Sequence, residues 1–166
     1  MATFLLYWNP FFSSYKMDRF LRDFNFPVGL DVLTEDEDWD RSPDFFNWSI
    51  IEHEKAKRGD RFFFVKVGYE KPTGIIGTGT FTSDPYVDED WSGQGRKTYY
   101  MDMEWDAVIN PKSDKILPTE TLAAEIPEVV WSKGKAGVMV SDEVTVKLQG
   151  LWEKHLKRVK LKVLVD

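Results

Sequence analysis

The sequence predicts an α+β domain built on a small curved or closed β-barrel with flanking helices. First, residues 61–67, 74–83 and 98–109 are rich in the β-branched and aromatic residues typical of strands. Second, segments with helical periodicity are few and do not alternate regularly with the strands, which argues against a parallel α/β sheet. Third, the 166 residues contain no repeat and no linker, so we expect a single domain spanning residues 1–166.

The first third of the chain predicts a strand, a helix and an acidic loop. Residues 2–8 form an apolar run that stops at an Asn-Pro pair, which is typical of a buried strand. Ser13 or Ser14 can cap a helix that reaches Phe24, because apolar side chains then recur every three to four positions. Residues 30–44 are dominated by acids and are expected to form a loop.

The middle of the chain predicts a hairpin and a long strand. Residues 45–51 are expected to begin a second short helical piece that reaches Lys57 or Arg58. A turn at residues 71–74 contains proline and glycine, and it joins the first two strand segments into a hairpin. Residues 84–96 are polar and loop-like, and they lead into the third strand segment.

The last third predicts two helices and two strands. We expect a short helix at residues 118–125 and a strand at residues 136–140. Ser141 can cap an amphipathic helix with acids in its first turn. The apolar face of that helix contains Val144, Leu148, Leu151, Trp152 and His155 or Leu156. Apolar and basic residues alternate at positions 159–165, which predicts a final strand.

Composition excludes several classes of protein. The chain has no cysteine, so a disulfide scaffold, a thiolate zinc site and a cysteine nucleophile are excluded. The apolar segment at residues 1–6 is too short for a signal peptide and carries no charged residue. No apolar run approaches the roughly 20 residues of a membrane span. We therefore expect a cytoplasmic protein. The net charge of −6 argues against non-specific phosphate binding, although basic residues cluster locally.

Motifs for catalysis are largely missing. The two histidines are far apart, no phosphate-binding loop is present, and no nucleophile elbow occurs. We accordingly predict no catalytic residues, no metal and no cofactor. Asp102 and Glu104 could form a carboxylate pair on one strand, which leaves a small metal-dependent hydrolase or nuclease as an alternative. A protein-interaction module that uses the acidic loop at residues 30–44 is a second alternative.

Five segments in order suggest a family. They are Phe4–Pro10, Phe46–Ser49 followed by Gly59–Phe64, Gly74–Tyr86, Tyr100–Met103, and residues 131–141 with the helix that follows. Together they resemble EVE domains of the PUA-like superfamily, which are related to YTH and ASCH domains. The last segment is similar to the ends of PUA-like modules found beside bacterial restriction nucleases.

The resemblance implies a PUA-like barrel that binds nucleic acid, DNA or RNA, without catalysis. An aromatic cage in such domains accepts a flipped, modified base. A base has two π faces and a hydrogen-bonding edge, so aromatic walls and a few polar groups suit it, and stacking contributes roughly 1–3 kcal/mol. It also implies a partner, a nuclease or modification enzyme encoded nearby.

Aromatic residues make up 15% of the chain, and some lie where a base pocket could form. We expect Trp48 to form one wall of the pocket, with Ser49 beside it, and Trp8, Tyr86 or Trp91 to form the opposite wall. Asn9 and Asp102 could read the edge of the base. Candidate phosphate contacts are Lys55, Lys57, Arg58, Lys133 and Lys135.

Overall fold

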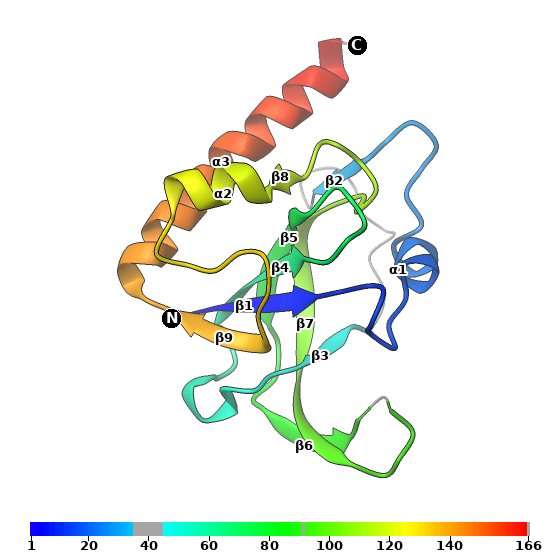
Figure 1. The fold of residues 1–166 in the computed structure, drawn as a ribbon, viewed down its shortest axis with the longest axis vertical. Coiled ribbons are helices and arrows are strands. Elements are labelled where there is room, and N and C mark those ends of the chain that lie inside the picture. Colours follow the sequence, from blue (N-terminus) through cyan, green and yellow to red (C-terminus); the bar gives the residue numbers. More distant parts are fainter. Residues whose placement is uncertain (35–44, 91, 166) are drawn as a thin grey trace.

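The computed structural model describes residues 1–34, 45–90 and 92–165, with side chains up to residue 160. Its centre is a mixed sheet with the strand order β2-β7-β5-β4-β1-β9 (Figure 1). These strands are β1 (Thr3–Trp8), β2 (Val32–Thr34), β4 (Arg61–Lys66), β5 (Gly74–Phe81), β7 (Lys97–Ile109) and β9 (Ala136–Val140). β1 and β4 run parallel, and the other neighbours in this order run antiparallel.

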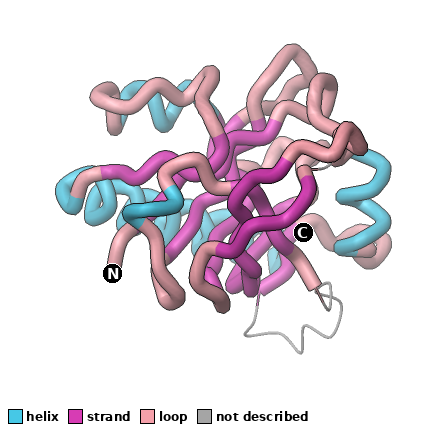
Figure 2. The backbone as a smooth tube through the Cα atoms, turned by 90° about the horizontal axis from the view of Figure 1, so that it is seen from below, coloured by secondary structure: helices cyan, strands magenta, loops and turns pink. Residues whose placement is uncertain are grey.

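Three α-helices flank this sheet. They are α1 (Met17–Phe24), α2 (Thr119–Glu125) and α3 (Asp142–Val165), and a short 3-10 helix covers His53–Lys55. Figure 2 shows the strands in the middle of the molecule with helices at its flanks. None of the helices in the described part of the chain combines the length and the apolar character that a membrane span requires.

The long strand β7 organises a second, smaller group of strands. Its C-terminal half pairs with β5 and β2, and its N-terminal half pairs with β3 (Asn47–Ser49) and β6 (Tyr86–Glu89). A short strand β8 (Leu117–Pro118) pairs with the start of β5. The β6–β7 hairpin extends away from the central sheet in Figure 1. β7 therefore joins the core of the domain to a projecting arm.

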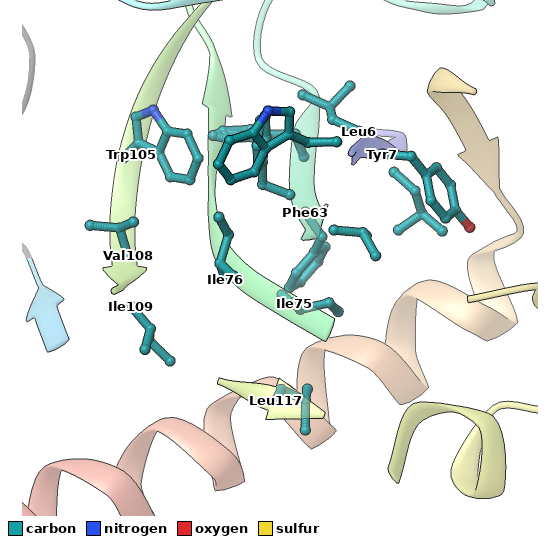
Figure 3. Close-up of a cluster of buried hydrophobic side chains, with 14 of the residues drawn as sticks. Leu6, Tyr7, Phe63, Ile75, Ile76, Trp105, Val108, Ile109 and Leu117 are labelled. Atoms are coloured by element: carbon teal, nitrogen blue, oxygen red, sulfur yellow. The ribbon is translucent and has the colours of Figure 1, made fainter. Parts of the chain in front are cut away.

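Aromatic side chains fill the core. The Trp8 ring stacks on Phe20 with centroids 5.0 Å apart, and Trp105 contacts Phe62 and Phe64 at 5.0 and 5.2 Å. Figure 3 shows buried side chains of the central strands, with Phe63 on the side toward the long helix and Trp105 farther from it. Each buried side chain of this size contributes roughly 1.5–3 kcal/mol through the area it removes from water.

The predicted α+β class is confirmed, and so are the hairpin β4–β5, the strand β7, and the strand β9. The Ser141 hydroxyl accepts a hydrogen bond from the Val144 backbone N–H at 3.2 Å, which caps α3 as predicted. Within the described residues the strand order has two ends, β2 and β9, so the closed form of the barrel is not observed.

Two predicted elements are wrong. Residues 45–58 contain strand β3 and a 3-10 turn where a helical piece was expected, because β7 supplies hydrogen-bond partners: Met103 N–H donates to Phe46 O at 2.8 Å. Residues 159–165 continue α3 and do not form a strand. Val159 is buried, and it lies at helical spacing from the buried residues Trp152 and His155. Packing of this helical face therefore outweighs the local alternation of apolar and basic residues that predicted a strand.

Two predicted loops contain short strands. β2 lies inside the acidic segment 30–44 and pairs with the end of β7, and β6 lies inside residues 84–96. Residues 35–44, which carry most of the predicted acidic loop, lie outside the described residues.

Candidate functional site

A cavity of about 580 Å³ lies between the loop after β1, strand β3 and the β6–β7 arm. Its lining comes from three segments that are distant in sequence. The residues are Phe12, Ser13, Ser14 and Lys16 from the loop, Trp48 and Ser49 from β3, and Asp90, Ser92, Thr98 and Tyr100 from the arm. The cavity thus combines aromatic rings with several hydroxyl groups.

The loop that forms one side of the cavity is held by Asn9. The Asn9 carbonyl accepts hydrogen bonds from the backbone N–H groups of Phe12 and Ser13 at 3.2 and 2.9 Å. Its side-chain oxygen accepts from the Phe11 N–H at 3.1 Å. Lys16 Nζ donates to the Phe11 carbonyl at 2.8 Å. Asn9 therefore shapes the loop and is not one of the cavity-lining residues.

Trp48 reaches the cavity from the core. Only 6% of its surface is exposed, and its ring lies parallel to Phe46 with centroids 6.2 Å apart. The ring also meets Phe64 edge-on at 4.8 Å and Tyr15 at 5.7 Å. The prediction that Trp48 lies beside a hollow fits this geometry, but most of the indole is packed against other rings.

Ser49 and Tyr100 face each other across β3 and β7. They are partners in the antiparallel register, and Tyr100 is also the partner of Tyr86 on β6. Both Ser49 and Tyr100 line the cavity, and Tyr100 is only 3% exposed. β3 and β7 therefore both contribute to the lining of the cavity.

Phe12 is the cavity residue that sequence analysis missed. Its side chain is 73% exposed at the cavity, and it meets the Phe11 ring edge-on at 5.0 Å. A phenylalanine directly after a turn carries no periodic signal, so the sequence offers only the unusual Phe-Phe pair as a hint.

Asp102 is held in a hydrogen-bonded network away from this cavity. The Tyr86 hydroxyl donates to Asp102 Oδ1 at 2.6 Å, and Asn47 Nδ2 donates to the Tyr86 oxygen at 2.9 Å. Burial and the bond to Asp102 raise the pKa of Tyr86 to about 12, so the phenol stays a donor at neutral pH. In the register Asp102 pairs with Asn47, whereas Trp48 pairs with Met101. Asp102 is not among the residues that line the cavity of Trp48.

The candidate opposite walls lie in different places. Trp8 is 1% exposed, and its Nε1 donates to the Tyr15 carbonyl at 2.7 Å, so this indole is part of the core. Tyr86 belongs to the Asp102 network and is not among the cavity-lining residues. Trp91 lies outside the described residues. Among the aromatic residues that were predicted for the pocket and that the structure describes, Trp48 alone lines this cavity.

The predicted phosphate contacts are spread over the surface. Lys55, Lys57 and Arg58 are exposed in the 3-10 helix and the turn before β4, and Lys55 pairs with Glu52 at 3.2 Å. Lys133 and Lys135 precede β9, and Lys133 lines a separate cavity of about 480 Å³. The cation that lines the cavity of Trp48 is Lys16 instead.

The carboxylates show no arrangement for metal-assisted catalysis in the described ranges. No three side chains of the types His, Asp or Glu gather there closely enough to hold an ion. Asp102 accepts the Tyr86 hydroxyl, and Glu104 is exposed on the same strand. Asp90, inside the cavity, accepts hydrogen bonds from the Ser92 side chain and backbone, and these bonds lower its pKa.

Comparisons with known proteins found distant structural likenesses. No protein-family model matches the chain, and no curated protein matches it. The chain is similar to the NMR structure of Rpa0253 from Rhodopseudomonas palustris, with 17% identity, a TM-score of 0.41, and coverage of 76% of this chain and 73% of that one. It is also similar to the Mmi1 YTH domain, with 12% identity, a TM-score of 0.49, and coverage of 95% and 78%. Both TM-scores are below 0.5, so the functional interpretation depends on the residues of this chain.

Proposed function

We propose that this chain is a non-catalytic nucleic-acid-binding domain that holds a flipped, modified base in the cavity lined by Phe12, Trp48 and Tyr100. One observation carries the proposal: aromatic rings from three distant segments surround a single hollow that also contains hydroxyl groups. Its volume of about 580 Å³ suits a small organic group, since ligand pockets range from roughly 300 to 1,000 Å³.

The aromatic, hydroxyl and ammonium groups of the lining suit different parts of a nucleotide. The exposed Phe12 ring can cover one face of a base, and the aromatic residues Trp48 and Tyr100 line the same cavity. The hydroxyls of Ser49 and Thr98 can donate or accept, so they can match the hydrogen-bonding edge of a base. Lys16 donates one hydrogen bond to a backbone carbonyl, and its ammonium group has further donors for a phosphate.

The cavity is large enough for a base that carries a substituent on its ring. Removing a base from its stack costs a few kcal/mol, and stacking on protein rings offsets this cost. In this proposal the domain is PUA-like and of the EVE type. It reads the base only, so cleavage or modification falls to a separate nuclease or modification enzyme, the partner that the sequence resemblance implies.

Phe12→Ala tests the proposal. We expect it to weaken binding of the preferred nucleotide roughly 5- to 150-fold, which corresponds to the loss of one stacking contact. Isothermal titration with unmodified and base-methylated nucleoside 5′-monophosphates of A, C, G and U would measure this. Phe12 is largely exposed, so the fold should be retained, as circular dichroism would show.

Tyr69→Ala is the matched control. Tyr69 is an aromatic residue that is 88% exposed, and it is not among the residues that line the cavity. Its removal should leave the affinity unchanged. Equal affinities of the wild type and Phe12→Ala for every nucleotide that binds would refute the proposed site. No binding of any unmodified or modified nucleotide would refute the function itself.

A further inference from the structure

A second cavity of about 540 Å³ lies next to the first. It is lined by Ser14, Tyr15, Arg19, Asp23, Phe45, Phe46, Asn47 and Asp88. Ser14 lines both cavities, and Asn47 directly precedes Trp48 of the first cavity. Asp88 pairs in register with Thr98, which lines the first cavity. The two hollows are therefore neighbours along the β3–β7–β6 strands.

An exposed aromatic residue, Phe45, lines the second cavity. Phe45 is 64% exposed, although it directly precedes the buried residue Phe46. Arg19 is also at the rim, with 63% of its side chain exposed, and its guanidinium lies 5.6 Å from the centre of the Tyr15 ring. A planar group that entered this cavity could stack on Phe45 and leave its charged part beside Arg19.

The polar groups of the second cavity include two carboxylates, Asp23 and Asp88. Asp23 accepts the Tyr15 hydroxyl at 2.7 Å and lies 4.0 Å from Arg19. Asp88 accepts the Glu89 backbone N–H through Oδ1, and in the described part of the chain it forms no ion pair. Its other oxygen remains an available acceptor. This lining disfavours a phosphate inside the cavity and favours a group with N–H donors.

We propose that the second cavity binds the nucleotide adjacent to the flipped base and selects a base with an exocyclic amino group. Phe45 stacks on this neighbouring base, and Asp88 accepts a hydrogen bond from the amino group. Cytosine carries this donor, whereas uracil places a carbonyl oxygen there and leaves two acceptors facing each other. This inference rests on the proposed function, because it takes the first cavity to be the site of the flipped base.

The test compares one nucleotide with two. The nucleoside 5′-monophosphate that binds best in the panel above would be titrated alone and as dinucleotides with cytidine or uridine on either side. Phe45→Ala should weaken binding of the cytidine dinucleotide about fivefold or more and leave the affinity for the monophosphate unchanged. Asp88→Asn should reduce the preference for cytidine over uridine, because the amide no longer presents only acceptors.

Tyr69→Ala is the control here too, since Tyr69 is 88% exposed and lines neither of the two cavities. It should not change the ratio of dinucleotide to monophosphate affinity. If Phe45→Ala leaves the dinucleotide affinity unchanged, or weakens both ligands equally, the second subsite is refuted. The proposed function is judged separately by Phe12→Ala with the monophosphate, so the two failures can be told apart.

Discussion

At the residue scale, Trp48 belongs both to the hydrophobic core and to the lining of the first cavity. A sequence cannot separate these two positions. Its ring lines the cavity, yet it is almost fully buried among Phe46, Phe64 and Tyr15. A variant that removes the indole therefore changes the core as well as the site. Phe12, which is exposed and lies at the same cavity, is the residue whose replacement tests the proposed binding without changing the core.

Trp48→Ala should destabilise the fold as well as weaken binding. Truncating a buried Trp or Phe typically costs about 3–5 kcal/mol, because the lost contacts and the remaining cavity both count. Urea denaturation followed by circular dichroism would measure the free energy of unfolding. Trp48→Phe keeps an aromatic ring and should lower the free energy of unfolding much less. A stability of Trp48→Ala within experimental error of the wild type would contradict the packing described above.

At the element scale, α3 is attached to the sheet by a row of buried residues and by one histidine. Trp152 meets Phe63 edge-on at 6.2 Å, and Val144, Leu148 and Val159 are buried on the same face. His155 Nε2 lies 2.6 Å from the Lys115 carbonyl, and its Nδ1 lies 3.1 Å from Arg158 Nη2. These contacts are those of a neutral ring that donates through Nε2 and accepts through Nδ1.

The histidine should make stability depend on pH. Burial lowers the pKa of His155 below its usual 6.5, and Arg158 adds to this, while the bond to the Lys115 carbonyl opposes it. The unfolded chain therefore binds a proton at a higher pH than the folded chain. Stability is full above pH 6.5 and falls as the pH drops from there toward the folded-state pKa.

His155→Gln should flatten this dependence, since glutamine cannot take up the proton. Free energies of unfolding measured in urea between pH 7.5 and 5 would show the difference between the two proteins. Carboxylates titrate in both, so the comparison isolates the histidine. Parallel curves for the wild type and the variant would show that His155 has the same pKa in both states.

At the scale of the whole molecule, the net charge limits how nucleic acid can bind. The chain has 28 acids against 22 lysines and arginines, and the cation that lines the first cavity is Lys16. Each phosphate that is neutralised contributes roughly −0.7 to the slope of log affinity against log salt for a single strand. A cavity-based reader with one or two phosphate contacts therefore has a shallow slope.

We expect a slope between about −0.7 and −1.4 for a short single-stranded oligonucleotide that contains the preferred base. Titrations at salt concentrations between 50 and 200 mM would measure it. A slope several times steeper would contradict this expectation and would indicate an extended basic surface. In that case Lys55, Lys57 and Arg58, which the sequence offers as phosphate contacts, would be the first residues to replace. Their replacement by glutamine should return the slope to the shallow range.

Elements with strong local signals could be predicted, and elements held by distant partners could not. The Pro-Gly turn and the flanking β-rich segments identify the β4–β5 hairpin, and Ser141 identifies the start of α3. Residues 47–49 form a strand because β7 lies beside them, and residues 159–165 continue a helix because Val159 packs with the buried face. Local propensity is weak compared with such tertiary contacts.

The sequence by itself determined the α+β class, the β4–β5 hairpin and the start of α3 at Ser141. Only the tertiary structure decided which rings are core and which reach a cavity, and it placed Phe12 and Lys16 beside Trp48 while leaving Asp102 with Tyr86. The physical reason is the register of β3 and β6 on β7. The pairing between distant strands decides which side chains lie on the same face of the sheet. A shift of the register by one residue would move every side chain of the shifted strand to the opposite face.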